Sequence, residues 1–298
     1  NSPVGRIAGI INHKHIQKWN EPYLRFGWFD FIDDPDISSV LLSAVADWAR
    51  QRKLTALHGP LGFTDLDREG MLIEGFEELG TLATLYNHPY YPEHMLQHGF
   101  EKDTDWVEFE LKVPVSLDSR ISRATDVILE RNHLKLVTPK TKRELLSYGP
   151  SLFQLINQEY SHLYGAVPLS EREIQHYIDA YFGFVHPDFI PLIVNKNENL
   201  VAFGVAIPSL SKALQKSCGR LFPLGWYQIL RALRRNPRAD LYLVAVAKPY
   251  QGLGINLVLM DRLCQVFNQR GIKVVESNPE LESNLDVQSQ WKIVEKRQ

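Results

Sequence analysis

Short apolar runs alternate with amphipathic stretches along the chain, and the order of these segments occurs twice. In the second half, the pattern predicts strands at Phe189–Val194 and Leu200–Ile207, joined by a polar, asparagine-rich turn. A strongly apolar strand follows at Leu241–Ala247, then a helix at Ile255–Arg270 and a strand at Ile272–Glu276. A glycine directly after the helix is typical of a left-handed helix end.

The first half has a similar order. Strands are expected at Gly5–Ile11 and Leu24–Ile32, followed by a helix at about Ile37–Lys53 and a strand at Leu54–His58. Residues 114–132 are polar and contain no long apolar run, so we expect a connector there. The repeated order predicts an α+β fold of two halves, each a mixed, mostly antiparallel sheet flanked by helices.

We place two domains at residues 1–115 and 116–298, which suits a chain of 298 residues. The chain starts without methionine, close to a strand, and stops in a charged stretch. We therefore expect the N-terminal part of the first domain and the C-terminal part of the second to be missing.

Composition excludes several function classes. The formal net charge is -2, so no global field attracts nucleic acid or membranes, and the sequence contains no firm nucleic-acid signal. The two cysteines, Cys218 and Cys264, form neither a disulfide framework nor a metal-binding spacing, which favours a reducing compartment, the cytoplasm. Two histidines at strand spacing, His13 and His15, have no accompanying carboxylate or cysteine at metal spacing, so we expect no metal.

The loop before the last long helix carries the clearest chemistry. It contains Gly252 and Gly254, two residues apart, between the apolar strand and the helix. Such glycines allow a tight turn and leave backbone N–H groups uncovered at a helix N-terminus, where they form an anion site suited to a pyrophosphate. A plain tight turn is the alternative. A dinucleotide-binding loop fits poorly, because Leu257 stands where its third glycine would be.

This order and loop resemble the GNAT family of N-acyltransferases, whose central helix begins with Gln/Arg-x-x-Gly-x-Gly/Ala. The residues Gln251-Gly252-Leu253-Gly254 match the glycine part, although Pro249 stands where the family has glutamine or arginine. The resemblance implies a splayed sheet, opening here after Ala247, and acetyl-CoA or a longer acyl-CoA as co-substrate. The implied cofactor-binding residues are Val244, Ala245, Val246, Gln251, Gly252, Leu253, Gly254, Ile255 and Asn256.

The resemblance also implies that an amine, of a small molecule or a peptide, attacks the thioester directly. A base must then take the amine proton and an acid must protonate the thiolate. Glu276, at the end of a strand, is our first choice for the base, followed by Glu282 and Asn284; a surface carboxylate is the alternative interpretation of Glu276. Residues 285–298 contain no tyrosine, so the acid stays unassigned.

The first half resembles the same fold with its site lost. Three carboxylates, Asp33, Asp34 and Asp36, stand where the glycine loop should be, and they would repel a pyrophosphate. Asn87, Tyr91 and Gly99-Phe100 resemble the ending that is common in the family. We therefore expect a degenerate copy, retained as a scaffold.

Residues 209–238 form a basic insertion with seven lysines and arginines and no acidic residue. A lid with a solvated face, a membrane-surface helix, an RNA contact and a gate over a long acyl chain all fit this pattern. Besides an N-acyltransferase, two functions therefore stay open. One is a non-catalytic acyl-CoA-binding or interaction protein, and the other is an aminoacyl-tRNA-dependent transferase.

Overall fold

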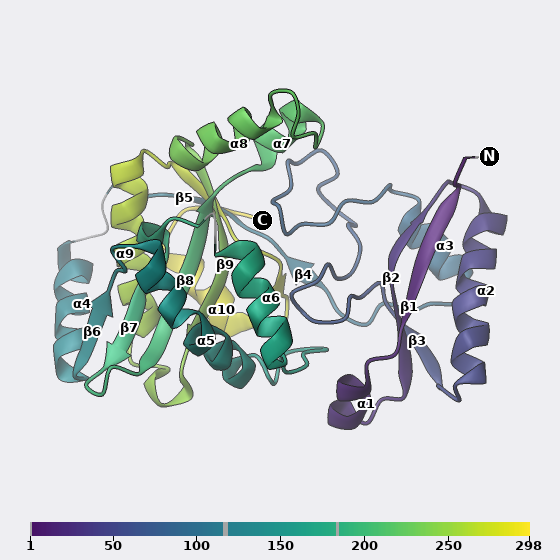
Figure 1. Ribbon diagram of the computed structural model, residues 1–298, viewed down its shortest axis with the longest axis horizontal. Helices are drawn as coiled ribbons and strands as arrows, with labels where there is room; N and C mark the ends of the chain where they lie inside the picture. Colours follow the sequence, from purple (N-terminus) through teal and green to yellow (C-terminus); the bar gives the residue numbers. More distant parts are fainter. Residues whose placement is uncertain (1, 116–118, 183–184) are drawn as a thin grey trace. The chain divides into compact units, whose positions relative to one another are not determined.

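The computed structural model describes residues 2–115, 119–182 and 185–298, and the chain divides into two compact units (Figure 1). Unit 1 extends to Asp105 and includes Leu163–Pro168, whereas unit 2 contains Trp106–His162 and Leu169–Gln298. The division at Asp105 comes ten residues before the end that we expected for the first domain. Residues 116–118, where we expected the second domain to begin, lie outside the described residues.

Unit 2 is built on a seven-stranded sheet in the order β12-β5-β10-β9-β8-β7-β6. All neighbouring strands are antiparallel except the parallel pair β9 and β10. The strands are β5 Glu110–Lys112, β6 Leu134–Val137, β7 Leu192–Asn195, β8 Leu200–Pro208, β9 Arg238–Val246, β10 Val274–Glu276 and β12 Lys296–Arg297. A separate antiparallel pair joins β4 (Trp106–Val107) to β11 (Glu280–Leu281). The mixed, mostly antiparallel α+β class is thus confirmed.

Helices cover this sheet (Figure 1). They are α4 Ser119–Arg131, α5 Lys142–Glu159, α6 Glu171–Tyr181, α7 Ser211–Ser217, α8 Gly225–Arg234, α9 Ile255–Arg270 and α10 Leu285–Ser289. The buried side chains of α9 pack against β7 and β8, where Val258 and Leu259 share a core cluster with Ile193 and Ala202. This helix has the bounds that the sequence predicted, and Gly271 ends it at φ 72°.

The expected connector at residues 114–132 is wrong, because α4 occupies most of it. Ile128 and Leu129 pack against the α9 cluster, and the Ser122 hydroxyl donates to the Asp261 carboxylate at 3.2 Å. Its few apolar residues lie at helical spacing on a mostly polar segment, so a search for long apolar runs does not detect it.

Unit 1 has a three-stranded sheet in the order β1-β2-β3, made by Gly5–Ile10, Tyr23–Phe31 and Ala56–His58. Its helices are α1 His13–Trp19, α2 Pro35–Gln51 and α3 Tyr91–Gln97. The strand spacing that we expected for His13 and His15 is wrong, because both lie in α1. An aromatic core that includes Phe26, Phe29 and Tyr91 joins β2 to α3.

The two units share a strand–helix–strand motif, β2-α2-β3 in unit 1 and β9-α9-β10 in unit 2. In each motif the two strands are parallel and pair over three residues, Tyr23–Arg25 with Ala56–His58 and Arg238–Asp240 with Val274–Glu276. The longer strand then continues for six residues without its parallel partner. The first half therefore repeats the central motif of the second, as expected for a tandem copy.

In unit 1, two features block the strand edge and the helix N-terminus of the shared motif. The segment after β3 fills the gap beside β2, because the Leu61 amide donates to the Phe26 carbonyl at 2.7 Å and a Cβ on Gly27 would lie 2.5 Å from the Leu61 oxygen. The Asp34 carboxylate caps α2 by accepting from the Asp36 amide at 2.9 Å. Both the strand edge and the helix N-terminus are thus occupied by the chain itself.

Candidate active site

The open edge of β9 lies beyond Asp240, where β10 stops pairing with it. The sheet therefore separates six residues before the end of β9, rather than after Ala247 as we expected. The carbonyl oxygens of Tyr242, Val244 and Val246 point to this edge, where they accept hydrogen bonds from the side chains of Asn278, Tyr160 and Gln251. All three predicted contact residues, Val244, Ala245 and Val246, also pair with β8, opposite Gly204, Phe203 and Ala202.

A β-bulge marks the point where the edge opens. Val205 of β8 is opposite Leu243, but the next residue, Ala206, is opposite Leu241, so Tyr242 is the extra residue on β9. Bulges redirect side chains and occur often beside active sites. Here the extra residue, Tyr242, comes two residues after Asp240, the last residue that pairs with β10.

The glycine loop leads from β9 into α9 with two residues in the left-handed region, Gly252 at φ 74° and Gly254 at φ 82°. Gly254 is the N-cap of α9 and provides no side-chain cap. Within the described ranges, the backbone amides of residues 252–256 meet no hydrogen-bond acceptor. This group of free N–H groups at the positive end of a 16-residue helix suits an anion.

The side chains of the loop have separate tasks. Gln251 donates to the Val246 carbonyl and to the Glu159 carboxylate, each at 2.9 Å, and Glu159 also accepts from the Lys248 amide. These bonds hold the loop against the end of α5. Ile255 is buried in the core, while Leu253 is exposed. The buried side-chain oxygen of Asn256 has no hydrogen-bond partner among the described residues.

The three predicted catalytic residues occupy different environments. Glu276 ends β10 opposite Asp240 and forms an ion pair with Arg238, which also binds Glu110. Asn284 caps α10 by accepting from the Val287 amide at 3.4 Å, and Glu282 is exposed just after β11. Among them, only Glu276 adjoins the point where the sheet opens.

Sequence analysis missed Asp240, the buried carboxyl at this point. It is 1% exposed, and its Oδ1 atom has no hydrogen-bond partner among the described residues. Burial raises the pKa of Asp240 to about 7, a hydrogen bond from Ser209 opposes the shift, and the charge of Glu276 adds to it. A carboxyl with this pKa exchanges protons at neutral pH, as a general base must. The residue lies just before Leu241, where the apolar run predicts the start of the strand, whereas β9 begins at Arg238.

Two phenols lie on or beside the same edge. The Tyr160 hydroxyl, at the end of α5, donates to the Val244 carbonyl at 2.9 Å. Burial, with a smaller contribution from Asp240, raises the pKa of Tyr242, so this phenol stays protonated at neutral pH. Both phenols lie before residues 285–298, the late segment where the family resemblance implies a tyrosine.

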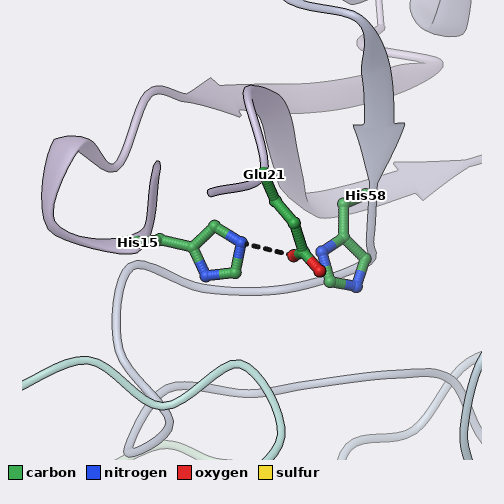
Figure 2. A group of neighbouring side chains, drawn as sticks. All are labelled: His15, Glu21 and His58. Atoms are coloured by element: carbon green, nitrogen blue, oxygen red, sulfur yellow. Dashed lines mark hydrogen bonds and ion pairs between the residues drawn. The ribbon is translucent and has the colours of Figure 1, made fainter. Parts of the chain in front are cut away.

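A second polar cluster lies in unit 1, where Figure 2 shows His15 and His58 around the carboxylate of Glu21. His15 Nε2 is 3.0 Å from Glu21, and one ligand atom from each residue lies within 4.8 Å of the others. This spacing alone would suit a metal ion. It is the only such group within the described ranges.

The hydrogen bonds of His15 argue against a metal in this cluster. Its Nδ1 atom is 2.8 Å from the Arg25 guanidinium, which can only donate, so the ring proton lies on Nε2 and is shared with Glu21. Nε2 therefore has no lone pair for a metal, and the buried guanidinium would repel a cation. Burial, helped by Arg25, lowers the pKa of His15 to about 4, which keeps the ring neutral. We interpret the cluster as a support for Arg25.

Comparison with known proteins agrees with this geometry. The sequence profile of the Acetyltransferase (GNAT) family matches residues 150–289. Protein YghO of Escherichia coli is 26% identical over 288 residues, which cover 94% of this chain and 73% of that protein. A bacterial ceramide synthase of Caulobacter vibrioides is 24% identical over 260 residues, which cover 83% of this chain and 65% of the synthase.

Solved structures show the same fold. A GCN5-related glucosamine N-acetyltransferase region in a fungal multi-domain β-N-acetylglucosaminidase superposes with a TM-score of 0.53 at 11% identity. The match covers 99% of this chain and 30% of that one. None of the helices in the described ranges has the length and hydropathy that a membrane span requires. The family match spans residues 150–289, which include the open strand and the glycine loop, so the resemblance to the GNAT acetyltransferase family lies in unit 2.

Proposed function

We propose that the chain is an acyl-CoA-dependent N-acyltransferase whose active site lies in unit 2. The observation that carries the proposal is the uncapped N-terminus of α9 behind Gly252 and Gly254, at the end of a strand that β10 does not pair with beyond Asp240. The corresponding helix of unit 1 begins with a carboxylate cap and has no such loop. The pyrophosphate of CoA binds to the free amides of residues 252–256 in this proposal.

From the loop, the pantetheine arm runs back along the open edge of β9. Asp240 and Val246 lie six residues apart, which is about 20 Å of extended strand, a span that an extended pantetheine arm can cover. Backbone groups of Tyr242 and Val244 on this edge pair with the amides of the arm. The thioester carbon then lies near the bulge, within reach of Asp240.

The acceptor amine attacks the thioester carbon, so that a C–N bond forms and the C–S bond breaks. Asp240 takes the amine proton, and the hydroxyl of Tyr160, which lies on the open edge, gives a proton to the thiolate. Burial suits Asp240 for this task because its pKa of about 7 leaves much of it ionised at neutral pH while it stays basic enough to accept a proton. Glu276 remains the second candidate for the base.

The acceptor that we propose is a long-chain amine. One relative, 24% identical over 260 residues, is named a ceramide synthase, and a ceramide is an amide of a fatty acid with a long-chain amino alcohol. The peptide amine that we left open at the sequence level has no corresponding support. Small water-soluble amines serve as the comparison substrates in the assay below.

Calorimetry with CoA tests the proposal. Gly254→Asp should weaken CoA binding at least ~10-fold, because the new side chain blocks the amides and its charge repels the phosphates. Gly99→Asp is the control for charge and backbone: Gly99 has φ 79° and open space around its Cβ position, so the change adds the same charge in the same left-handed region, without the contact that a Cβ on Gly254 makes with Ile128. Equal affinity in all three proteins would show that the loop is only a turn.

A turnover assay separates the enzyme from a mere acyl-CoA-binding protein. Release of free CoA from a long-chain acyl-CoA should require a long-chain amino alcohol and should exceed the rate with soluble amines. CoA binding without release would favour the non-catalytic alternative. Transfer from aminoacyl-tRNA instead of acyl-CoA would contradict the proposal.

A further inference from the structure

The connection between β8 and β9 is a helical hairpin made by α7 and α8, residues 211–234, instead of a tight turn. Figure 1 shows it beyond the ends of the two strands, at the margin of unit 2. The hairpin is internally well packed. Ala213 and Gly225 are buried, and a Cβ on Gly225 would lie 1.8 Å from the Arg220 oxygen. The same Cβ would lie 3.1 Å from Ser217 Cβ at the end of α7, so the start of α8 packs closely on both the turn and α7.

Large apolar side chains on this hairpin face solvent instead of the core. The exposed residues are Leu221, Phe222, Leu224, Trp226, Tyr227 and Leu230. Phe222 is 79% exposed, the highest value among them. They belong to ten consecutive residues at the turn and the first half of α8, and we call them the apolar surface of the hairpin. Such a patch on a soluble domain marks an interaction site.

Basic side chains surround the apolar surface. Lys212, Lys216, Arg220, Arg231, Arg234 and Arg235 are all exposed. Within the described ranges none of the six forms an ion pair. The sequence from Ser209 to Ala239 contains no aspartate or glutamate. The positive charge of the hairpin is therefore not balanced locally.

We propose that this hairpin docks on the surface of an anionic lipid bilayer. An aliphatic and aromatic surface flanked by cations matches the two layers of a membrane interface, with the rings among the acyl chains and glycerol and the cations at the phosphates. A polyanion such as RNA would pair with the arginines and stack on the rings. It would leave Leu221, Leu224 and Leu230 in water.

The docked hairpin adjoins the end of β9 that carries Asp240. The Ser209 amide donates to the Arg238 carbonyl at 3.0 Å, and the Arg238 amide donates to the Asn236 side chain at 3.1 Å, so the hairpin is anchored two residues from Asp240. If the proposed function holds, a lipid amine could enter at this end without leaving the bilayer surface. Membrane binding itself requires neither CoA nor catalysis.

Co-sedimentation of the full chain with vesicles tests the docking. We expect binding to phosphatidylcholine vesicles that contain about 30 mol % phosphatidylglycerol, and at least ~10-fold weaker binding to phosphatidylcholine alone. Phe222→Ser with Leu224→Ser should weaken binding to the anionic vesicles at least ~10-fold, because both side chains would insert. Arg231→Glu with Arg234→Glu should weaken it comparably and reduce its dependence on salt.

Two control pairs keep the test specific. Val40→Ser with Leu96→Ser removes two equally exposed apolar side chains from unit 1, and Lys135→Glu with Lys196→Glu reverses two exposed charges elsewhere in unit 2. Both should bind as the wild type does. The proposal is overturned if the wild type does not bind anionic vesicles, or if the control variants lose as much binding as the hairpin variants. It is also overturned if only the two charge reversals weaken vesicle binding and the wild-type protein binds tRNA. Unchanged CoA affinity in the hairpin variants separates this outcome from failure of the proposed function.

Discussion

Arg25 and Asp240 occupy the same position in the two units. Each is the last residue of a parallel ladder of three pairs, opposite His58 and Glu276 respectively. The Arg25 guanidinium is held by the carbonyl of Gly165 at 2.6 Å and by His15, so its position is filled by the protein itself. Asp240 keeps an oxygen without a partner among the described residues. One position thus serves stability in one copy and is available for chemistry in the other.

Asp240→Asn should remove the pH dependence of acyl transfer near neutrality. In the wild type the rate should rise with pH and reach half of its maximum near pH 7, because only the ionised carboxylate takes a proton. The amide cannot do so, and we expect a loss of roughly 10²–10⁴-fold in kcat at pH 8. Calorimetry should show unchanged CoA affinity. A variant that keeps the wild-type pH profile would exclude Asp240 as the base.

Glu276→Gln distinguishes the two carboxyl groups. Loss of the Glu276 charge should lower the pKa of Asp240, because that charge helps to raise it. The acidic limb of the pH–rate profile should therefore move to lower pH while the maximal rate changes little. If Glu276 is itself the base, the maximal rate should instead collapse with CoA binding intact. Steady-state kinetics across pH 5–9 separates these results.

The two loop glycines should differ in their tolerance of a methyl group. Gly252→Ala and Gly254→Ala each place alanine in the left-handed region, at a cost of about 1 kcal/mol in the free energy of unfolding. At Gly254 the new Cβ would also lie 2.8 Å from Ile128 Cδ1, whereas Gly252 has open space. Urea denaturation should show the larger loss for Gly254→Ala. An Ile128→Val background, which lacks that Cδ1 atom, should reduce the difference.

His15 should make the protein less stable in mild acid. Its pKa is about 4 in the folded state, below the ordinary value of 6.5, so between these values the unfolded chain binds a proton that the folded chain does not. Stability should therefore fall as the pH falls from 6.5 to 4. His15→Gln, whose oxygen can still accept from Arg25, should lose less Tm between pH 7 and pH 5.

Glu69 changes stability with pH in the opposite direction from His15, so the pH dependence of His15→Gln must be compared with that of the wild type. Burial, with repulsion from Asp65, raises the pKa of Glu69 to about 8. The contribution of this group to stability is therefore lost as the pH rises from 4.5 to 8. Glu69 is present in both proteins, so its effect cancels when the pH dependence of Tm is compared between His15→Gln and the wild type. Identical pH dependence in both proteins would contradict the assignment of a neutral, buried His15.

Zinc should not stabilise unit 1. Because the Nε2 atom of His15 carries the ring proton, an equimolar addition of Zn²⁺ should leave the Tm unchanged, and a chelator should have no effect. His58→Gln provides the control. A rise in Tm with Zn²⁺ that His58→Gln removes would show that the cluster of His15, Glu21 and His58 is a metal site.

The fold could be predicted where local signals agree. The bounds of α9 follow from Gly254 and Gly271, and the Ser170 capping box marks the start of α6. Helix α4 could not be found in the same way, because its polar composition hides a narrow apolar stripe. The early opening of the sheet also escaped prediction, since it depends on how far β10 pairs with β9 and not on any residue within β9.

The site was predictable only in its loop. Gly252 and Gly254 are recognisable because their spacing and their place before a helix are local. Asp240 becomes notable only through its burial and its unpaired oxygen, which result from strands that lie far apart in the sequence. The support of Arg25 is equally non-local, since Gly165 lies 140 residues away.

The segment Leu163–Pro168 has a practical consequence for dissecting the protein. It belongs to unit 1, where the Gly165 carbonyl accepts from Arg25 and the Ala166 carbonyl accepts from Lys18 and Trp19, yet the chain on both sides of it builds unit 2. A gene fragment that stops at Asp105 would encode the first copy without Gly165. The buried Arg25 guanidinium would then lose the carbonyl to which it donates at 2.6 Å. No single cut yields both copies intact, so the two copies must be expressed as one piece.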